Sequence, residues 1–299
     1  MNIFHPSAED FARVMRFMYA CDVAEFGEPD SDEGDTADQW QEADLQQDAW
    51  LAQTPAGDLC GYAIINSAGK RGLTFDLYTL PDETGQAARR TLLKLVVERA
   101  GKLAAGTTTL TTYVSGFTPA NRALMEASGF SLHTLHYRMQ IDFSGPLEPV
   151  IWPAEYSLHS VTERDERELY ELINAAFDWP GRSPVSFEDW KKHLFRDGRY
   201  DPRYFILVRK AGVLVAAALS YNEGSLGWVR QLAVCKELQG KGLGSMLLRH
   251  VFSVYSGLGV PSVALGVELK NEKAAAFYDH LGMRRSREFL EYRMQIDDL

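Results

Sequence analysis

The chain has 299 residues, is 45% hydrophobic and carries a formal net charge of −10. Its length and hydrophobic content are sufficient for a sizeable core and favour two domains or one large one. The negative charge argues against a nucleic-acid partner, which needs a basic face, and against an anionic membrane surface. Between Arg16 and Lys70 the chain has many acids and no other Lys or Arg. We interpret this stretch as a solvated acidic loop, with a field that attracts cationic amines as the alternative.

The three cysteines, Cys21, Cys60 and Cys235, are far apart and form no C-x-x-C pair. We therefore expect neither a disulfide framework nor a metal site, and a reducing cytoplasm fits this cysteine usage. The N-terminal residues lack a basic segment followed by an apolar run, and no apolar run reaches the roughly 18 residues of a membrane helix. The sequence thus predicts a soluble cytoplasmic protein.

A six-residue repeat, Tyr-Arg-Met-Gln-Ile-Asp, occupies residues 137–142 and again residues 292–297. Each copy follows a short helical pattern that ends near a glycine. Two copies at a domain-sized spacing indicate two homologous domains rather than a solenoid. The proline-rich stretch at 144–153 suits an extended linker. We predict domains over residues 1–145 and 154–299.

Strand and helix patterns alternate through the second half of the chain. Thr162 with Asp165, and Ser186 with Asp189, are capping patterns that predict the starts of two helices. Periodicity predicts further helices at 246–255 and 272–281, and strands at 156–161, 204–208, 213–220, 227–234, 262–267 and 289–296. This order predicts an α/β fold around a mixed sheet.

A glycine-rich turn, Gln239-Gly240-Lys241-Gly242-Leu243-Gly244, joins the strand at 227–234 to the helix that follows. Main-chain N–H groups at the start of a helix attract anions, and glycine lets a phosphate approach the backbone closely. The spacing G-x-G-x-G matches neither the Rossmann G-x-G-x-x-G nor the Walker G-x-x-x-x-G-K-[ST] motif. By itself the turn is as consistent with a flexible helix cap as with a pyrophosphate site.

This turn and the residues after it resemble the GNAT family of N-acetyltransferases. The family's loop, [Q/R]-x-x-G-x-[G/A], is matched at 239–244, and the family's later helix with Asn at its start and an aromatic pair is matched by Asn271, Phe277 and Tyr278. The two motifs cover the C-terminal half, and the repeat extends the resemblance to the N-terminal half. It implies two tandem GNAT-like domains, each a mixed, mostly antiparallel sheet flanked by helices.

The resemblance also implies acetyl-CoA as co-substrate. The N–H groups of the turn would hold its pyrophosphate, that is, those of Gln239, Gly240, Lys241, Gly242, Leu243 and Gly244. The strand edge Leu232-Ala233-Val234 would pair with the pantetheine arm, and the Val234 N–H would polarise the thioester carbonyl. Asn271 and Phe277 would contact the arm, and Tyr278 would protonate the departing thiolate. As alternatives, Asn271 is only a helix cap and Tyr278 only a core aromatic.

An amine acceptor must lose a proton, but no residue that could act as the base occurs on the strand where the family usually carries one. Many family members carry a carboxylate on the strand before the turn, whereas residues 227–232 contain no acid. Glu223 and Glu268 are the alternatives, and a hydroxyl or thiol acceptor stays open.

Three functions follow from these motifs. The first is an N-acyltransferase that moves acetyl to the primary amine of a small molecule. The second is a non-catalytic acyl-CoA-binding or regulatory module. The third, a nucleotide-binding protein, is disfavoured because the Walker Ser/Thr is missing.

The first half lacks the corresponding residues. Alignment through the repeat places Arg89 opposite the last glycine of the turn, where a phosphate needs bare backbone. Thr118 and Met125 fall opposite Asn271 and Tyr278. We predict that the N-terminal domain does not catalyse and instead shapes the substrate cleft or stabilises the pair.

Overall fold

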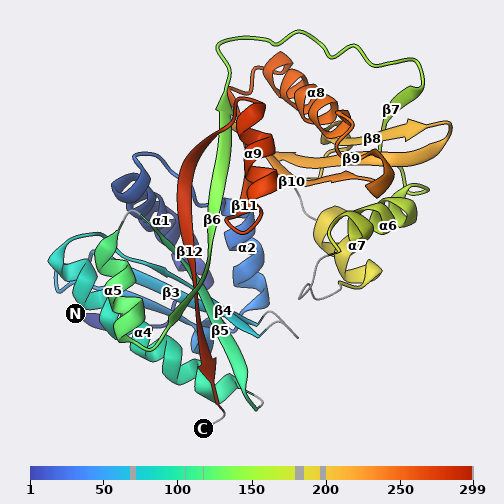
Figure 1. Cartoon of the computed structure of the whole chain (residues 1–299). Coiled ribbons are helices and arrows are strands. Elements are labelled where there is room, and N and C mark those ends of the chain that lie inside the picture. Colours follow the sequence, from blue (N-terminus) through green and yellow to red (C-terminus); the bar gives the residue numbers. More distant parts are fainter. Residues whose placement is uncertain (68–71, 105, 117, 179–184, 196–199, 298–299) are drawn as a thin grey trace. The chain divides into compact units, whose positions relative to one another are not determined.

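A computed structural model describes residues 1–67, 72–104, 106–116, 118–178, 185–195 and 200–297. The chain forms two compact units: the first comprises Met1–His136 with Glu288–Leu299, and the second comprises Tyr137–Arg287. Figure 1 traces both along the sequence. Each unit is a sheet flanked by helices, which confirms the predicted α/β class.

The first unit begins with β1 and a 3₁₀ turn at Ala8–Asp10 and takes up the end of β12. Its helices and strands are β1 (Asn2–Phe4), α1 (Phe11–Phe26), α2 (Glu33–Glu42), α3 (Leu45–Asp48), β2 (Ala49–Gln53), β3 (Leu59–Ser67), β4 (Leu73–Tyr78), α4 (Glu83–Leu103), β5 (Thr108–Ser115), α5 (Pro119–Ala127), the first part of β6 (Ser131–Asp142) and most of β12 (Arg284–Ile296).

The sheet of the first unit has the order β1-β2-β3-β4-β5-β12. Only β4 and β5 run parallel among its registered pairs. Both faces are covered, because successive residues of β2 enter different cores: Ala49 and Leu51 pack with α1 and α2, whereas Trp50 and Ala52 pack with α4. This alternation follows from the two-residue period of a strand.

The second unit contains the elements on which the predicted site lies. They are the end of β6, then β7 (Tyr156–Ser160), α6 (Glu166–Ala176), α7 (Phe187–Phe195), a 3₁₀ turn (Pro202–Tyr204), β8 (Phe205–Lys210), β9 (Val213–Asn222), β10 (Leu226–Val234), a 3₁₀ turn (Lys236–Leu238), α8 (Leu243–Gly257), β11 (Ser262–Glu268), α9 (Glu272–His280) and the start of β12.

The sheet of the second unit has the order β6-β11-β10-β9-β8-β7. Figure 1 shows α8 on one face of β8–β10 and α6 and α7 on the other. Strands covered on both faces need apolar residues throughout rather than alternation. Accordingly β9 is buried at every position from Leu214 to Tyr221.

The two copies of the repeat are exchanged between the units. Residues 137–142 follow the first half in sequence but belong to the second unit, next to β11. Residues of the second copy pair with β5 of the first unit, with Tyr292 opposite Thr112. The limits 1–145 and 154–299 remain a prediction about domains, and the compact units have different limits because of this exchange.

Leu290 allows the exchange to be tested. Its side chain is 1% exposed and packs in the core beneath β5. We expect Leu290→Ala to lower the free energy of unfolding of the first unit by about 2–5 kcal/mol, because it leaves a cavity there. Amide hydrogen exchange should accelerate in β5 and stay unchanged in β9. Gln295→Ala, at an exposed position of the same strand, serves as the control. Faster exchange confined to β9 would contradict the assignment.

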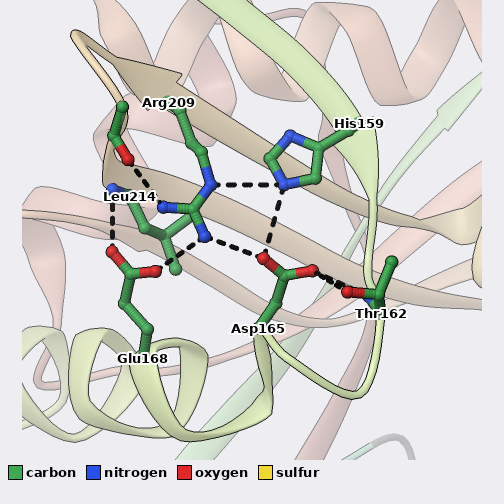
Figure 2. Close-up of polar contacts among 7 residues, drawn as sticks. His159, Thr162, Asp165, Glu168, Arg209 and Leu214 are labelled. Carbon is green, nitrogen blue, oxygen red and sulfur yellow. Dashed lines mark hydrogen bonds and ion pairs between the residues drawn. The ribbon is translucent and has the colours of Figure 1, made fainter.

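A polar network fixes the start of α6 against the β8–β9 hairpin (Figure 2). Arg209 Nη2 donates to Asp165 Oδ1 at 2.7 Å and to Glu168 Oε2 at 2.6 Å. The second oxygen of Glu168 accepts the Leu214 N–H at 3.0 Å. Thr162 donates its hydroxyl and its N–H to Asp165 Oδ2. Thr162 and Asp165 pair as predicted, with the carboxylate as the acceptor, but α6 begins at Glu166 without a side-chain cap, three residues later than the capping pattern predicts.

The network makes stability depend on pH through Asp165. Burial raises the pKa of this carboxyl, but hydrogen bonds from Thr162 and Arg209 outweigh it and bring the pKa from 3.8 to about 2. A pKa that is lower in the folded state stabilises above the unfolded value, and this stabilisation is lost as pH falls from about 4 to about 2.

We therefore expect Asp165→Asn to lower the free energy of unfolding by at most about 2 kcal/mol at pH 7 and by little at pH 2. Urea unfolding at both pH values measures this. Glu155→Gln, in the exposed pair with Lys210, should change neither value detectably. An equal loss for Asp165→Asn at both pH values would rule out the charge as its cause.

Candidate active site

Strands β10 and β11 run parallel and pair only at one end. Residues 226–228 are in register with residues 262–264. Beyond Trp228, no described residue of β10 pairs with β11, whereas β10 stays paired with β9 as far as Val234. One edge of β10 therefore leaves main-chain groups without a strand partner.

The antiparallel register identifies these groups. Residues in such a pair alternate between those that exchange hydrogen bonds and those whose N–H and C=O point to the other side. The Cys235 N–H donates to the Val215 carbonyl at 2.8 Å, so Val234 and Leu232 direct their N–H groups away from β9. Ala233 belongs to the bonded set and its side chain is buried in the core. The predicted edge therefore offers Leu232 and Val234 to a ligand.

The glycine-rich turn leads into an open helix start. Gly240 and Gly242 have φ of 72° and 87°, which side chains other than glycine adopt at a cost. The helix α8 begins at Leu243 with no side-chain cap and no acid in its first turn. The first N–H groups of a helix have no partner within the helix and lie at its positive end. This start can accept an anion.

The turn lies against the end of β10. The Gln239 amide donates to the Val234 carbonyl at 3.0 Å. A Cβ atom on Gly244 would lie 3.5 Å from the Val234 side chain and 3.6 Å from the ring of Phe277. Three predicted site residues from the strand, the turn and α9 thus converge. Lys241 is exposed, and Leu243 has its side chain in the core and therefore offers only its N–H.

Asn271 caps α9. Its Oδ1 accepts the Ala274 N–H at 3.2 Å, which confirms the helix-cap interpretation, and its side chain is otherwise exposed. Contact with a pantetheine arm stays a prediction for Asn271 and Phe277. The cap fixes the start of the helix and hence the place of the Phe277–Tyr278 pair, whose ring centroids lie 5.2 Å apart.

Tyr278 is half-buried and packs against the core of the second unit. Among the described residues no partner hydrogen-bonds to its phenolic oxygen. Burial raises the pKa of the phenol to about 12. At neutral pH the group is therefore a protonated donor whose hydrogen is available to a substrate.

The two candidate bases lie at different ends of the sheet. Glu223 lies in the β9–β10 turn, where its N–H donates to the Leu226 carbonyl, about 26 Å along β10 from Val234. Glu268 ends β11, at the same edge as the glycine-rich turn, and forms an exposed ion pair with Lys270 at 3.7 Å. Of the two, only Glu268 lies at the end of the sheet where the predicted site residues gather.

The sequence pattern missed Gln231. The register of β10 shifts between Val229 and Gln231, and beyond this bulge Gln231 lies on the same face as Ala233, two residues along the strand. The Gln231 Oε1 atom is buried without a hydrogen-bond donor among the described residues. A buried acceptor without a donor is costly, which makes this atom a candidate contact for a substrate. Nothing in the sequence pattern distinguishes it, because its burial depends on the elements that pack against β10.

The first unit differs at each corresponding position. The Asp82 carboxylate caps α4 by accepting the Gly85 N–H at 2.6 Å, and Glu83 adds a second acid to the first turn. Thr118 donates its hydroxyl to Glu25 at 2.8 Å, and Met125 is buried in the core. An acidic helix start repels a diphosphate. These contacts support the predicted lack of catalysis in the first unit, which stays a prediction.

Neither a membrane-spanning helix nor a metal-binding cluster occurs among the described residues. No helix there is both long enough and apolar enough to cross a membrane. No group of three His, Cys, Asp or Glu side chains there is placed to hold a metal ion.

Comparison with known proteins agrees with the geometry. Residues 166–283 match the acetyltransferase (GNAT) family. A mycothiol acetyltransferase from Streptomyces coelicolor is 26% identical over 255 residues, which are 82% of this chain and 79% of that protein. The crystal structure of a GCN5-related N-acetyltransferase from Sphaerobacter thermophilus has a TM-score of 0.85 and 26% identity, covering 100% of this chain and 97% of the other.

A tandem GNAT protein from the clavulanic acid biosynthesis pathway has the same fold, with a TM-score of 0.72 at 16% identity over 98% of both chains. The chain is therefore an acetyltransferase whose residues 166–283 match the GNAT family and whose fold is that of a tandem GNAT protein, and acetyl-CoA is its co-substrate.

Proposed function

We propose that the second unit transfers the acetyl group of acetyl-CoA to a primary amine of a small molecule by direct attack. The observation that carries this proposal is the pair of N–H groups on Leu232 and Val234 that point away from β9 beside the open start of α8. The two features together form a binding edge for an extended thioester with a diphosphate at one end. The small-molecule acceptor is supported by the name of the Streptomyces relative.

The chain's main-chain groups do most of the binding. The N–H groups of the turn and of the first turn of α8 hold the diphosphate. Leu232 pairs with the pantetheine arm as an added strand, which leaves the Val234 N–H for the thioester carbonyl. Phe277, which lies beside Gly244 and Val234, covers the arm with apolar surface. No side-chain charge is needed for this binding.

The reaction requires stabilisation of the negative charge on the thioester oxygen and a proton for the leaving sulfur. The amine nitrogen attacks the thioester carbon, and the Val234 N–H stabilises the negative charge that develops on the carbonyl oxygen. As the C–S bond breaks, Tyr278 donates its proton to the leaving sulfur. A phenol with a pKa of about 12 is a weaker acid than a free thiol at about 8.5. Proton transfer therefore accompanies C–S cleavage, when the sulfur is most basic, in a site whose burial disfavours a thiolate.

The acceptor amine is positioned by polar groups near the same edge. Gln231 Oε1 accepts a hydrogen bond from the amine and orients its lone pair toward the thioester carbon. Glu268, which ends β11 and is partly exposed, receives the amine's proton through solvent. An amide at position 231 does not remove a proton itself, so the base lies farther from the reacting atoms.

Tyr278→Phe tests the proton donor. We expect kcat to fall about 100-fold with little change in the KM for acetyl-CoA, since the variant lacks the acid but keeps the ring. Release of free thiol with a panel of small amines measures it. In the wild-type protein the pKa of about 12 means that Tyr278 causes no loss of activity as pH rises to about 10.

Tyr255→Phe is the matched control. This buried phenol donates to the Tyr221 carbonyl at 2.8 Å, so its loss should lower stability and leave kcat unchanged. An undiminished kcat in Tyr278→Phe would exclude Tyr278 as the acid. Tight binding of acetyl-CoA without acetylation of any amine would instead favour the non-catalytic acyl-CoA-binding module.

Ser245→Asp tests the helix start. An acid in the first turn of α8 stabilises the helix by about 0.3–1 kcal/mol, but it repels a diphosphate held there. We therefore expect a higher melting temperature together with an affinity for coenzyme A about tenfold lower, measured by calorimetry. The two effects have opposite signs, which separates loss of binding from loss of folding.

Ser253→Asp places the same charge on α8, about 12 Å farther along the helix. It should leave the affinity for coenzyme A unchanged. If Ser245→Asp binds coenzyme A as tightly as the wild-type protein, the diphosphate is not held at the start of α8.

A further inference from the structure

The first unit contains a polar cavity of about 130 Å³ between diverging strands. Strands β4 and β5 are parallel and pair only at Leu73 with Leu110 and Thr74 with Thr111. The cavity is lined by residues of both strands beyond these pairs, by α1, and by side chains from α4 and α5. It has room for at least about four water molecules, the scale of a small metabolite.

Arg89 supplies a positive charge to the wall. Its side chain enters from α4, is 6% exposed, and donates from Nε to the Thr79 hydroxyl at 2.8 Å. Burial lowers the pKa of the guanidinium, although the Glu25 carboxylate opposes this. Among the described residues no carboxylate lies within 4 Å of Arg89, and no group accepts from its terminal nitrogens. A buried guanidinium in this state favours a bound anion.

Carboxylates also line the wall. Asp22, on α1, is 5% exposed and accepts the N–H groups of Asp30 and Ser31 through Oδ2. Asp76, on β4, accepts from the Gln39 amide at 2.6 Å, and burial raises its pKa although this hydrogen bond opposes it. Neither acid lies within 4 Å of a described cation. They favour a bound cation or hydrogen-bond donor.

Asn121 adds an unsatisfied acceptor. This residue lies in the first turn of α5, lines the cavity and is 4% exposed. Its Oδ1 atom has no hydrogen-bond donor among the described residues. A buried amide oxygen costs about 1–3 kcal/mol when it is left unpaired. A ligand with an N–H donor would satisfy it.

The sign of the charges selects the class of ligand. A simple anion suits Arg89 but is repelled by Asp22, Asp76 and nearby Glu25, and a simple cation is repelled by Arg89. We propose that this cavity binds a small amino-acid-like zwitterion, with its carboxylate on the Arg89 guanidinium and its ammonium toward Asp76 and Asn121. The site is separate from acetyl transfer, because every lining residue belongs to the first unit.

The same cavity does not suit coenzyme A. In the second unit, the diverging strands lead to an open helix start, whereas here the start of α4 is capped by Asp82. Arg89, about 1.7 turns after the first residue of that helix, lines the space between the strands. In the first unit the parallel strands also diverge, but charged side chains line the space between them.

Calorimetry with matched ligands tests the proposal on the full-length protein. L-Alanine, glycine and L-serine carry both charges, propionate lacks the ammonium of alanine, and ethylamine lacks its carboxylate. We expect at least one zwitterion to bind with a Kd at least tenfold below those of propionate and ethylamine. No binding by any zwitterion, or equal binding by either fragment, would overturn the proposal.

Variants of α4 locate the ligand. Arg89→Met should raise the Kd of the bound zwitterion at least tenfold while keeping the fold, since removal of an unpaired buried charge relieves its desolvation. Arg90→Met, at the exposed neighbouring position, should leave the Kd unchanged. An equal Kd in Arg89→Met would place the ligand elsewhere and overturn the assignment. Should Arg89→Met fail to fold, the ligand series on the wild-type protein still decides.

Discussion

The chemistry of the second unit depends on the loss of pairing between β10 and β11. Strands in a parallel sheet normally satisfy both edges, so a strand that parts from its neighbour leaves N–H groups in fixed directions. Here the antiparallel partner β9 determines which residues these are. Leu232 and Val234 are selected by register, and their side chains matter less than their place in the strand. Donors held this way need no rearrangement when charge develops on a substrate.

Both units show such a parting of parallel strands, and the difference between them lies in the helix that follows. Glycines with positive φ leave the start of α8 bare, whereas Asp82 and Glu83 neutralise the start of α4. One scaffold thus gives an anion site in one unit and a closed helix end in the other. The buried Arg89 moves the positive charge of the first unit from the helix end into the space between the strands.

Much of this was predictable from local patterns. The pairing of Ser186 with Asp189 is confirmed by reciprocal hydrogen bonds. The turn before α8 could be predicted because its backbone has positive φ at Gly240 and Gly242, which favours glycine. Helix limits were less accurate: α8 begins three residues before the predicted 246, since Gly244 hides the periodicity. Gln231 and the cavity at Arg89 could not be predicted, because both depend on which elements pack together in three dimensions. The repeat revealed two units, but identical sequence does not say which sheet a strand joins.

The exchange of terminal strands determines the order in which the chain can fold. Gln295 and Thr109 are neighbours in one sheet although they are 186 residues apart in sequence. During synthesis, β5 is made long before its partner β12. The edge of β5 that pairs with β12 therefore stays unpaired while the second unit assembles. The entropy of closing so long a loop makes this last pairing slow. The half of the protein that is made first is therefore completed last, and until then its exposed strand is the point most open to wrong association.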